Sequence, residues 1–222
     1  GLSVSIAPHA PYSISEDLWE MLAEELVQES ITTMHNQESS QENQMFQKGG
    51  GSLVELFEKM GLLEKTPLLG SSSLQTVFKY LQSEQILLVH NTFLSKSDLA
   101  FLTNSDKKVG FVFCPTSNAQ ITEKMPDFDM LMNSGFPVML GTDSVASGQS
   151  LDLLGEMKYL QIHSNVTFEE MLSWVTINAA NYMQWDDMGK LKEGTKPGIN
   201  LITGFDFENK VLKSTSKIRR IL

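Results

Sequence analysis

The sequence predicts an α/β fold that forms part of a parallel (β/α)8 barrel of the TIM type. Short β-branched or apolar runs alternate along the chain with runs at helical spacing. Several apolar runs end in an ionisable residue, as barrel strands do at their carboxyl ends: His35, His90 and Asp143. After Met188 the helical spacing stops and short strands joined by turns follow, which predicts the carboxyl-terminal part of a small β-sandwich domain.

Composition sets the class of protein before any motif is considered. The 222 residues suffice for one large domain with a small appendage, and we place the barrel part over residues 1–187 and the sandwich segment over 188–222. A formal net charge of −10 argues against nucleic acid as a partner. No apolar run approaches the roughly 20 residues of a membrane span, so no membrane partner is expected. The single cysteine, Cys114, excludes an internal disulfide and fits a cytoplasmic location.

The first expected elements lead up to the candidate site. A strand over residues 2–7 is stopped by Pro8, and Ser15 begins a helix that runs to about residue 30. Its buried face is expected to carry Leu18, Leu22, Leu26 and Val27. A strand over residues 31–34 then ends at His35.

The polar stretch over residues 37–51 ends in three glycines, which predicts a mobile loop. A plain connector is the alternative, but the length and position favour a lid over the strand end. Further helices are expected over residues 53–60, 74–81, 95–102, 127–132, 151–162 and 168–183. Further strands are expected over residues 85–89, 109–114, 138–140, 200–203 and 211–222.

The predicted barrel strands number five, and they end near Pro8, His35, His90, Cys114 and Asp143. A closed barrel of this type needs eight. Five strands leave two exposed edges, which a stable protein has to cover. We therefore expect this chain to be the later part of a longer protein, and a homodimer would help to cover the edges.

The stretch from His35 to Glu38 carries the chemistry that the site needs. A histidine at a strand end can direct a ring nitrogen toward a metal ion. A carboxylate three residues later can carry protons to and from a water that the metal activates. A structural histidine is the common alternative, but His90 and Asp143 follow the same strand-end logic. Cys114 closes an apolar strand and is expected in the core, and His163 is expected on the surface.

Four segments together resemble the metal-dependent deaminase and chlorohydrolase branch of the amidohydrolase superfamily, in particular deaminases of the methylthioadenosine/S-adenosylhomocysteine and aminodeoxyfutalosine types. The segments are Pro8-His9-Ala10-Pro11-Tyr12, His35-Asn36-Gln37-Glu38-Ser39, Val89-His90-Asn91 and Gly141-Thr142-Asp143-Ser144-Val145-Ala146-Ser147. The resemblance continues in Cys114-Pro115-Thr116-Ser117-Asn118 and in Gly189-Lys190-Leu191 with Pro197-Gly198. It spans the whole chain in the order that the family has.

The resemblance implies a role for each of these residues. His35 and Asp143 would bind one divalent metal ion, which would be zinc, with iron or manganese as alternatives. Asp143 would also accept a proton from the attacking water. Glu38 would pass a proton to the substrate ring and the leaving amine, and His90 would polarise the forming tetrahedral centre.

The resemblance also implies two substrate contacts, and at some positions this sequence differs from the family pattern. His9 would bind the substrate, and Ser147 would line its pocket. Thr116 stands where the branch often has arginine, and Asn200 where it usually has aspartate. None of the four histidines forms the His-x-His pair that supplies the family's first metal ligands. We expect that pair in a missing amino-terminal portion, and the isolated chain to be inactive; a degenerate chain is the alternative.

The function expected from these observations is hydrolytic deamination of an aminated heterocycle, an adenosine-like nucleoside derivative. A hydrolase of another C–N bond or of a C–halogen bond is a second reading. A catalytically inactive barrel fragment that binds a partner is a third, and a complete small α/β binding domain with coincidental motifs is a fourth. The expected partners are the small-molecule substrate and the amino-terminal portion of the same protein.

Overall fold

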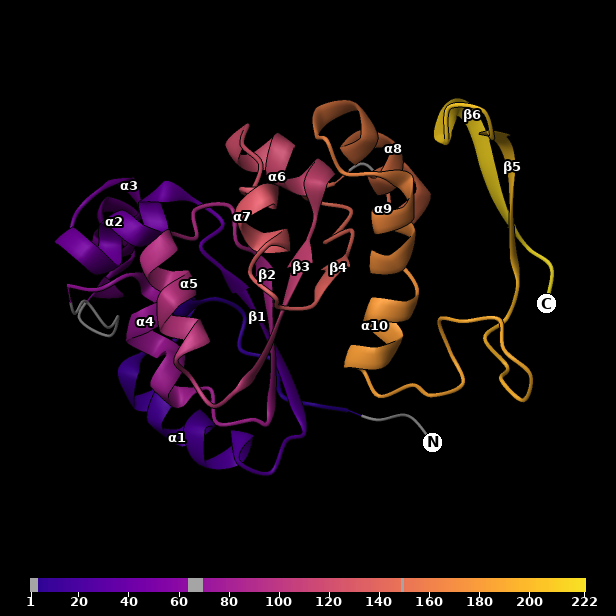
Figure 1. Cartoon of the computed structure of the whole chain (residues 1–222). Coiled ribbons are helices and arrows are strands. Elements are labelled where there is room, and N and C mark those ends of the chain that lie inside the picture. Colours follow the sequence, from indigo (N-terminus) through magenta and orange to yellow (C-terminus); the bar gives the residue numbers. More distant parts are fainter. Residues whose placement is uncertain (1–3, 64–69, 149) are drawn as a thin grey trace. The chain divides into compact units, whose positions relative to one another are not determined.

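Strands and helices alternate along the chain, which a computed structural model describes over residues 4–63, 70–148 and 150–222 (Figure 1). The chain divides into two units, residues 1–111 and 112–222. The strands of the described residues pair in the order β1-β2-β3-β4, and a separate sheet pairs β5 with β6. The expected α/β alternation is therefore present, with four strands in the main sheet of the described part.

The first unit is built on β1 (Ile31–Asn36) and β2 (Gln85–His90), which pair in parallel. The register sets His35 opposite Val89 and Asn36 opposite His90, so both strands end at the same edge of the sheet. Strand β3 (Lys108–Phe113) begins in this unit, where the Lys108 N–H donates to the Glu84 carbonyl oxygen over 3.3 Å. Parallel pairing requires a crossover between the strands, and helices supply it.

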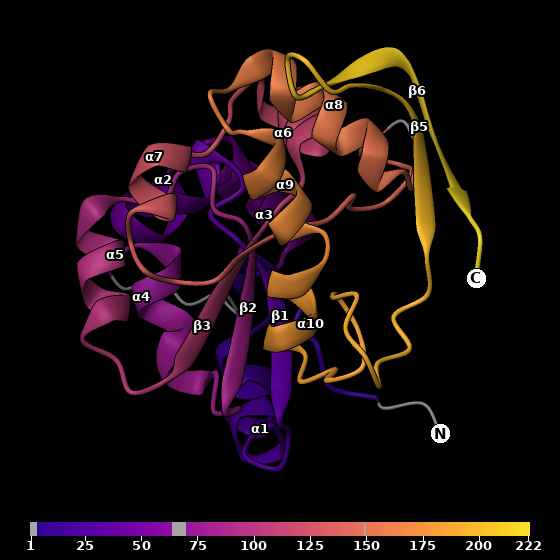
Figure 2. The same cartoon turned by 45° about the vertical axis from the view of Figure 1, so that its right-hand side comes forward.

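The helices of the first unit begin at residues whose side chains cap them. Ser15, Ser39, Ser72 and Ser95 each accept a hydrogen bond from a backbone N–H in the first turn that follows. The elements are α1 (Glu16–Leu26), α2 (Ser40–Lys48), α3 (Ser52–Met60), α4 (Ser73–Val77), η3 (Phe78–Tyr80) and α5 (Lys96–Thr103). Helices α4 and α5 lie side by side in two views (Figures 1 and 2).

The strand expected over residues 2–7 is not formed by its described residues, 4–7. Residues 2 and 3 lie outside the described part of the chain. The segment nevertheless follows β1, because Thr32 donates its hydroxyl to the Ile6 carbonyl oxygen over 2.8 Å. The His35 N–H donates to the His9 carbonyl oxygen over 2.9 Å. Two isolated bonds of this kind do not make a ladder, and Pro8 removes a further donor.

The mobile loop expected over residues 37–51 is wrong, because residues 40–48 form α2. Ser39 caps this helix, and Gly49 ends it in the left-handed conformation at φ 62°. Met45 and Phe46 are fully buried, so an apolar face holds the helix in place. Because most residues of this stretch are polar, its sequence did not reveal the narrow apolar face.

Helix α1 begins at the predicted cap but ends at Leu26, earlier than expected. Its buried face carries Trp19 and Leu26, whereas Leu18 and Val27 are exposed, which corrects the expected face. Trp19 stacks on Tyr80 with ring centroids 5.7 Å apart. The buried face therefore contains one predicted aliphatic position, Leu26, and an aromatic ring that the aliphatic spacing did not include.

The second unit continues from the end of β3 to β4 (Val138–Leu140), where the Gly141 N–H donates to the Phe113 carbonyl oxygen over 2.7 Å. Cys114 is buried and His163 is exposed, as predicted. The helices are α6 (Pro115–Thr122), α7 (Phe128–Met132), α8 (Leu153–His163), α9 (Phe168–Trp174) and α10 (Ile177–Tyr182). The sequence did not predict α6, and the single helix expected over 168–183 is two helices, interrupted where Thr176 leaves the helical conformation.

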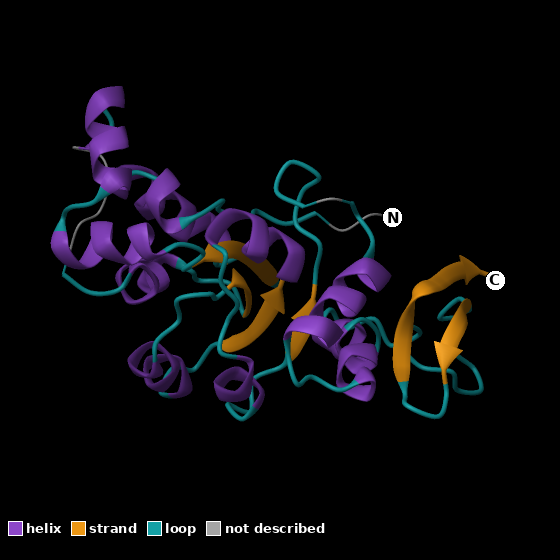
Figure 3. Ribbon diagram, turned by 90° about the horizontal axis from the view of Figure 1, so that it is seen from above, coloured by secondary structure: helices purple, strands orange, loops and turns teal. Residues whose placement is uncertain are grey.

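Strands β5 (Asn200–Asp206) and β6 (Val211–Arg220) form the antiparallel ribbon near the carboxyl terminus (Figure 3). Helix α8 holds β6 by two polar side chains. Gln161 both donates to the Leu212 carbonyl oxygen over 2.9 Å and accepts from its N–H over 2.7 Å. Lys158 donates to the carbonyl oxygens of Ser214 and Ser216. Within the described residues, none of the helices has the length and apolar character to cross a membrane.

Candidate metal and proton-transfer site

His35 stands at the end of β1, and the backbone fixes which of its ring nitrogens carries hydrogen. Nδ1 lies 2.9 Å from the His9 carbonyl oxygen. A carbonyl oxygen can only accept, so Nδ1 is the donor and Nε2 is the nitrogen with a lone pair. An imidazole oriented by a carbonyl oxygen in this way is typical of metal-ligating histidines. The His9 ring lies edge-on to the His35 ring, with centroids 4.7 Å apart.

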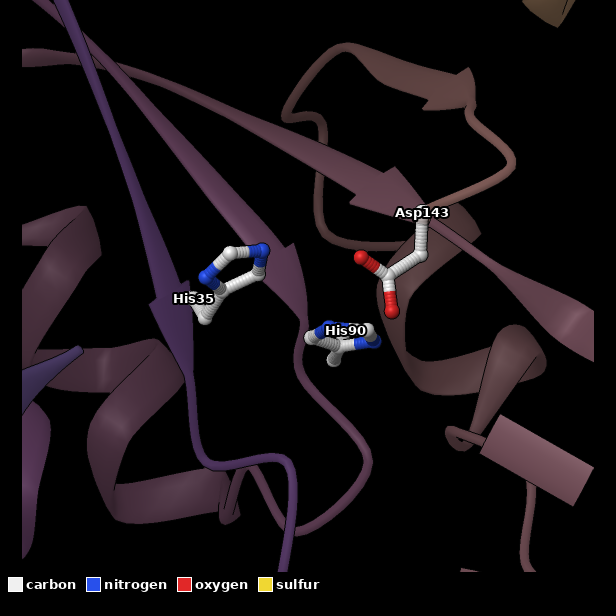
Figure 4. A group of neighbouring side chains, drawn as sticks. All are labelled: His35, His90 and Asp143. Carbon is white, nitrogen blue, oxygen red and sulfur yellow. The ribbon is translucent and has the colours of Figure 1, made fainter. Parts of the chain in front are cut away.

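His90 and Glu38 meet beside His35 in the first unit. The His90 ring stacks on the His35 ring with centroids 5.2 Å apart, and Figure 4 shows the two rings at the ends of their strands. His90 Nε2 lies 3.5 Å from Glu38 Oε1. The His90 side chain is 1% exposed and the Glu38 side chain 16%, so this contact is largely sheltered from water.

The backbone at His90, whose side chain contacts Glu38, has an unfavourable conformation. His90 and Asn91 both have positive φ, 72° and 57°, a conformation that residues with a Cβ rarely adopt. Asn91 is held by its N–H to the Asn36 carbonyl oxygen over 3.0 Å and by its side chain to the Leu88 carbonyl oxygen over 2.7 Å. The strain at the end of β2 is thus offset by bonds to β1 and to β2 itself.

Asp143 belongs to the second unit and follows β4 (Figure 4). Its φ is 56°, again in the left-handed region. Asp143 Oδ2 accepts hydrogen bonds from Ser117 Oγ over 2.8 Å and from Ser147 Oγ. Two hydroxyl donors on one oxygen hold the carboxylate in one orientation. The structure therefore brings the predicted Ser147 onto Asp143 through a direct hydrogen bond.

Thr116, which departs from the resemblance described above, is paired with a buried carboxylate. Glu156 of α8 accepts from the Thr116 N–H over 2.9 Å and from its hydroxyl. Burial raises the pKa of Glu156, and the neighbouring Asp152 and Asp143 raise it further, although the bonds from Thr116 oppose the shift. Glu156 fixes the start of α6, one residue before Ser117.

A buried polar network next to the backbone of Glu38 contains two acids that the sequence did not indicate as site residues. Glu42 is 1% exposed and Asp98 is equally buried, and both accept several hydrogen bonds. Burial raises the pKa of Glu42 to about 7, against the lowering effect of bonds from Ser73, Gln37 and Glu38. A signal for both acids existed, because each stands three residues after a serine that caps a helix, as in Ser39-x-x-Glu42.

The predicted residues of the first unit converge. His35 and His90 stand at the ends of β1 and β2, Glu38 follows β1 and contacts His90, and the His9 ring packs against the His35 ring. In the described part of the chain, His35, His90 and Asp143 are candidate metal-ligand residues. Two imidazoles and a carboxylate are ligands that divalent first-row metals accept.

A protein-family model and several known proteins match this chain. A model of the family described as the amidohydrolase family matches residues 1–219. The 5-methylthioadenosine/S-adenosylhomocysteine deaminase of Pyrococcus furiosus is 28% identical over 207 residues, which cover 89% of this chain and 44% of that protein. This chain spans less than half the length of the curated relatives that it matches.

Solved structures share the fold. The aminofutalosine deaminase of Helicobacter pylori superposes with a TM-score of 0.74 at 22% identity, covering 88% of this chain and 50% of that one. The same enzyme has been solved with methylthio-coformycin. An adenosine deaminase of Xanthomonas campestris with bound zinc gives a TM-score of 0.61 at 21% identity, covering 88% and 42%. At these identities the likeness shows a fold of the TIM-barrel type.

Proposed function

Because this chain belongs to the amidohydrolase family, we propose that it is the later part of a metal-dependent hydrolase that deaminates an aminated heterocycle. The observation that supports this most is the arrangement at the ends of β1 and β2. His35 presents Nε2 because the His9 carbonyl oxygen takes Nδ1–H, and Glu38 lies 3.5 Å from His90 beside it. The barrel part would cover residues 1–187 and the sandwich segment 188–222.

We propose that His35 and Asp143 hold the metal ion, and zinc is favoured because a structural neighbour carries it. When bound, such an ion supplies a nucleophilic water at neutral pH. Asp143 would take a proton from that water, since its carboxylate is held by Ser117 and Ser147. His90 would stabilise charge that develops on the substrate, because it is buried and fixed by a strained backbone.

Glu38 would give its proton to the ring nitrogen, regain a proton from Asp143, which took it from the water, and then give that proton to the leaving amine. A carboxylate that alternates between acid and base does this best when it is partly shielded from water, and the Glu38 side chain is 16% exposed. The substrate would be an adenosine-like nucleoside derivative that also contacts His9. The deaminase names of the relatives and the methylthio-coformycin complex support this class of substrate.

The test uses the protein encoded by the complete reading frame. We expect it to carry about one equivalent of divalent metal and to release ammonia from methylthioadenosine, S-adenosylhomocysteine or adenosine. Glu38→Gln should lower kcat by about 100-fold or more, because general acid–base catalysis typically contributes that much. The exposed Glu55→Gln is the matched control. Protein without metal and without ammonia release would instead favour an inactive barrel that binds a partner.

A further inference from the structure

The turn that connects β1 to Glu38 has a conformation that needs external support. Gln37 has a φ of 47°, in the left-handed region, and its side chain is fully buried. For a residue with a Cβ this backbone conformation is unfavourable, so it is stable only when neighbouring groups form hydrogen bonds or contacts that hold it. The direction in which Glu38 leaves the strand depends on this turn.

Glu42 holds the turn from one side. Its Oε1 accepts the Gln37 N–H over 3.0 Å, and its Oε2 accepts the Glu38 N–H over 3.3 Å. Ser73 at the start of α4 donates its hydroxyl to Oε1. Glu42 belongs to α2, whose own start is fixed because Ser39 Oγ accepts the Glu42 N–H over 3.3 Å. Both oxygens of one buried carboxylate are therefore occupied by the turn and its neighbour.

Asp98 and the end of β2 hold the turn from the other side. Gln37 donates its side-chain amide to Asp98 Oδ2 over 3.0 Å and to Asn43 Oδ1 over 3.2 Å. The Gln37 carbonyl oxygen accepts the Phe93 N–H over 3.0 Å. Residue 37 is thus fixed through its N–H, its carbonyl and its side chain.

The geometry at Glu42 differs from ordinary helix capping. In a capping box the acid three residues into the helix accepts the N–H of the capping residue, which here is Ser39. Glu42 instead accepts the N–H groups of the two residues before the cap, 37 and 38. A carboxylate is costly to bury, and it offers two acceptor oxygens where an amide offers one. Its bonds act on the turn, not on the helix.

We propose that Glu42 is a positioning residue that sets the direction of Glu38 toward His90. This inference rests on the proposed function, in which Glu38 transfers the proton. Glu42 touches neither substrate nor metal in this proposal; it acts only through the backbone of residues 37 and 38. Its removal should therefore disturb Glu38 without disturbing the rest of the sheet.

The experiment compares Glu42→Gln with two controls in the metal-loaded protein from the complete reading frame. The comparison is made at pH 8, where Glu42 is ionised because its pKa is about 7. Glutamine keeps the shape but has one acceptor oxygen, so one of the two turn N–H groups loses its partner. Ser73→Ala removes the hydroxyl and leaves both carboxylate oxygens, and Glu55→Gln removes a charge from an exposed site. Hydrogen exchange is followed by mass spectrometry with residue-level fragmentation, and ammonia release gives kcat and KM.

For Glu42→Gln we expect amide exchange at Gln37 and Glu38 to rise about 10-fold or more, with Leu88 on β2 unchanged. We expect kcat to fall about 10-fold or more, with KM within about twofold, because only the proton carrier is misplaced. The two controls should match wild type in exchange at Glu38. A uniform rise across β1 and β2 would show a purely structural role and overturn the proposal, and so would unchanged exchange at Glu38.

The two proposals fail in different ways. If Glu38→Gln releases ammonia at the wild-type rate, Glu38 does not transfer the proton and the proposed function is contradicted. The exchange measurement at residues 37 and 38 does not depend on that result. Local loss of protection in Glu42→Gln together with full activity of Glu38→Gln would therefore retain Glu42 as the anchor of the turn and reject its catalytic consequence.

Discussion

At the scale of single residues, the candidate site is decided by what each side chain is bonded to. The sequence predicted His35, His90 and Asp143 as site residues because apolar strands end there, and Glu38 because it follows His35 by three residues; both signals are local. It did not locate Glu42 or Asp98 as site residues. Their partners lie as far as 61 residues away, as in the bond from Gln37 to Asp98. Such bonds depend on the tertiary fold. The Ser-x-x-acid spacing in the sequence indicates where each helix begins, but it does not indicate the distant partners of the acid.

Zinc binding gives the first prediction at this scale. We expect His35→Ala to weaken zinc binding by about 100-fold or more, because the proposed site would lose a ligand whose tautomer the backbone fixes. Competition with a chromogenic chelator on the complete protein measures the affinity. His163→Ala is the control, since His163 is exposed at the end of α8. Equal affinities in the two variants would exclude His35 as a ligand.

The raised pKa of Glu42 predicts how the free energy of unfolding changes with pH. Burial raises its pKa from 4.5 to about 7 in the folded protein. The folded state therefore holds the proton more tightly, and the resulting stabilisation is fully present below pH 4.5 and lost as pH rises through 7. The loss is roughly 3 kcal/mol. Urea unfolding of wild type and Glu42→Gln at pH 5 and pH 8 isolates it, because the variant lacks this titration. The same pH slope in both proteins would contradict the assignment.

At the scale of elements, the two helices α2 and α6 were missed, whereas the expected starts of α1, α3, α4, α5, α7, α8 and α9 lie within two residues of the observed ones. Residues 40–48 form α2 although the stretch is polar, since two buried apolar side chains and a serine cap suffice. The strands of the main sheet were predicted well, because they are short runs rich in apolar or β-branched residues. The exception is the segment over residues 4–7, where extended backbone without a ladder looks the same as a strand in sequence.

Asp98 connects the starts of α4 and α5 by hydrogen bonds, so replacing it should destabilise both helix starts. It accepts from Ser72 at the start of α4 and from Ser95 at the start of α5. Burial acts to raise the pKa of Asp98, but the hydrogen bonds from Ser72, Ser95 and Gln37 lower it overall. Asp98→Ala should cost about 2–4 kcal/mol in the free energy of unfolding. Denaturant unfolding measures it against the exposed Asp106→Ala, and an equal effect would refute the role.

The carboxyl-terminal ribbon gives a prediction that belongs to α8 and β6. Gln161 makes paired bonds to the N–H and carbonyl of Leu212, which is buried. Gln161→Ala should cost about 1–2 kcal/mol and raise amide exchange selectively in β6, because a buried backbone N–H loses its acceptor. Ile162→Ala, at an exposed position of the same helix, is the control. Unchanged exchange in β6 would show that other contacts hold the ribbon.

At the scale of the whole molecule, the sequence supported a barrel-type α/β fold, and the family match and the solved structures agree with it. It could not supply the number of strands. The four paired strands of the described residues are fewer than the eight of a closed barrel, and the curated relatives are more than twice as long as the matched part. Closure is a property of the complete polypeptide, because each edge needs a neighbouring strand.

The bond from His35 to the carbonyl oxygen of His9 has a consequence for how the site tolerates change. Main-chain oxygens survive every amino-acid replacement, so drift at residue 9 would leave the imidazole tautomer intact. In the proposed site, substrate preference and metal affinity would therefore evolve separately at this position. The side chain of residue 9 could change to suit a new substrate, while its carbonyl oxygen keeps the His35 ring in the same orientation. Laboratory evolution that randomises residue 9 should yield altered specificity without loss of metal.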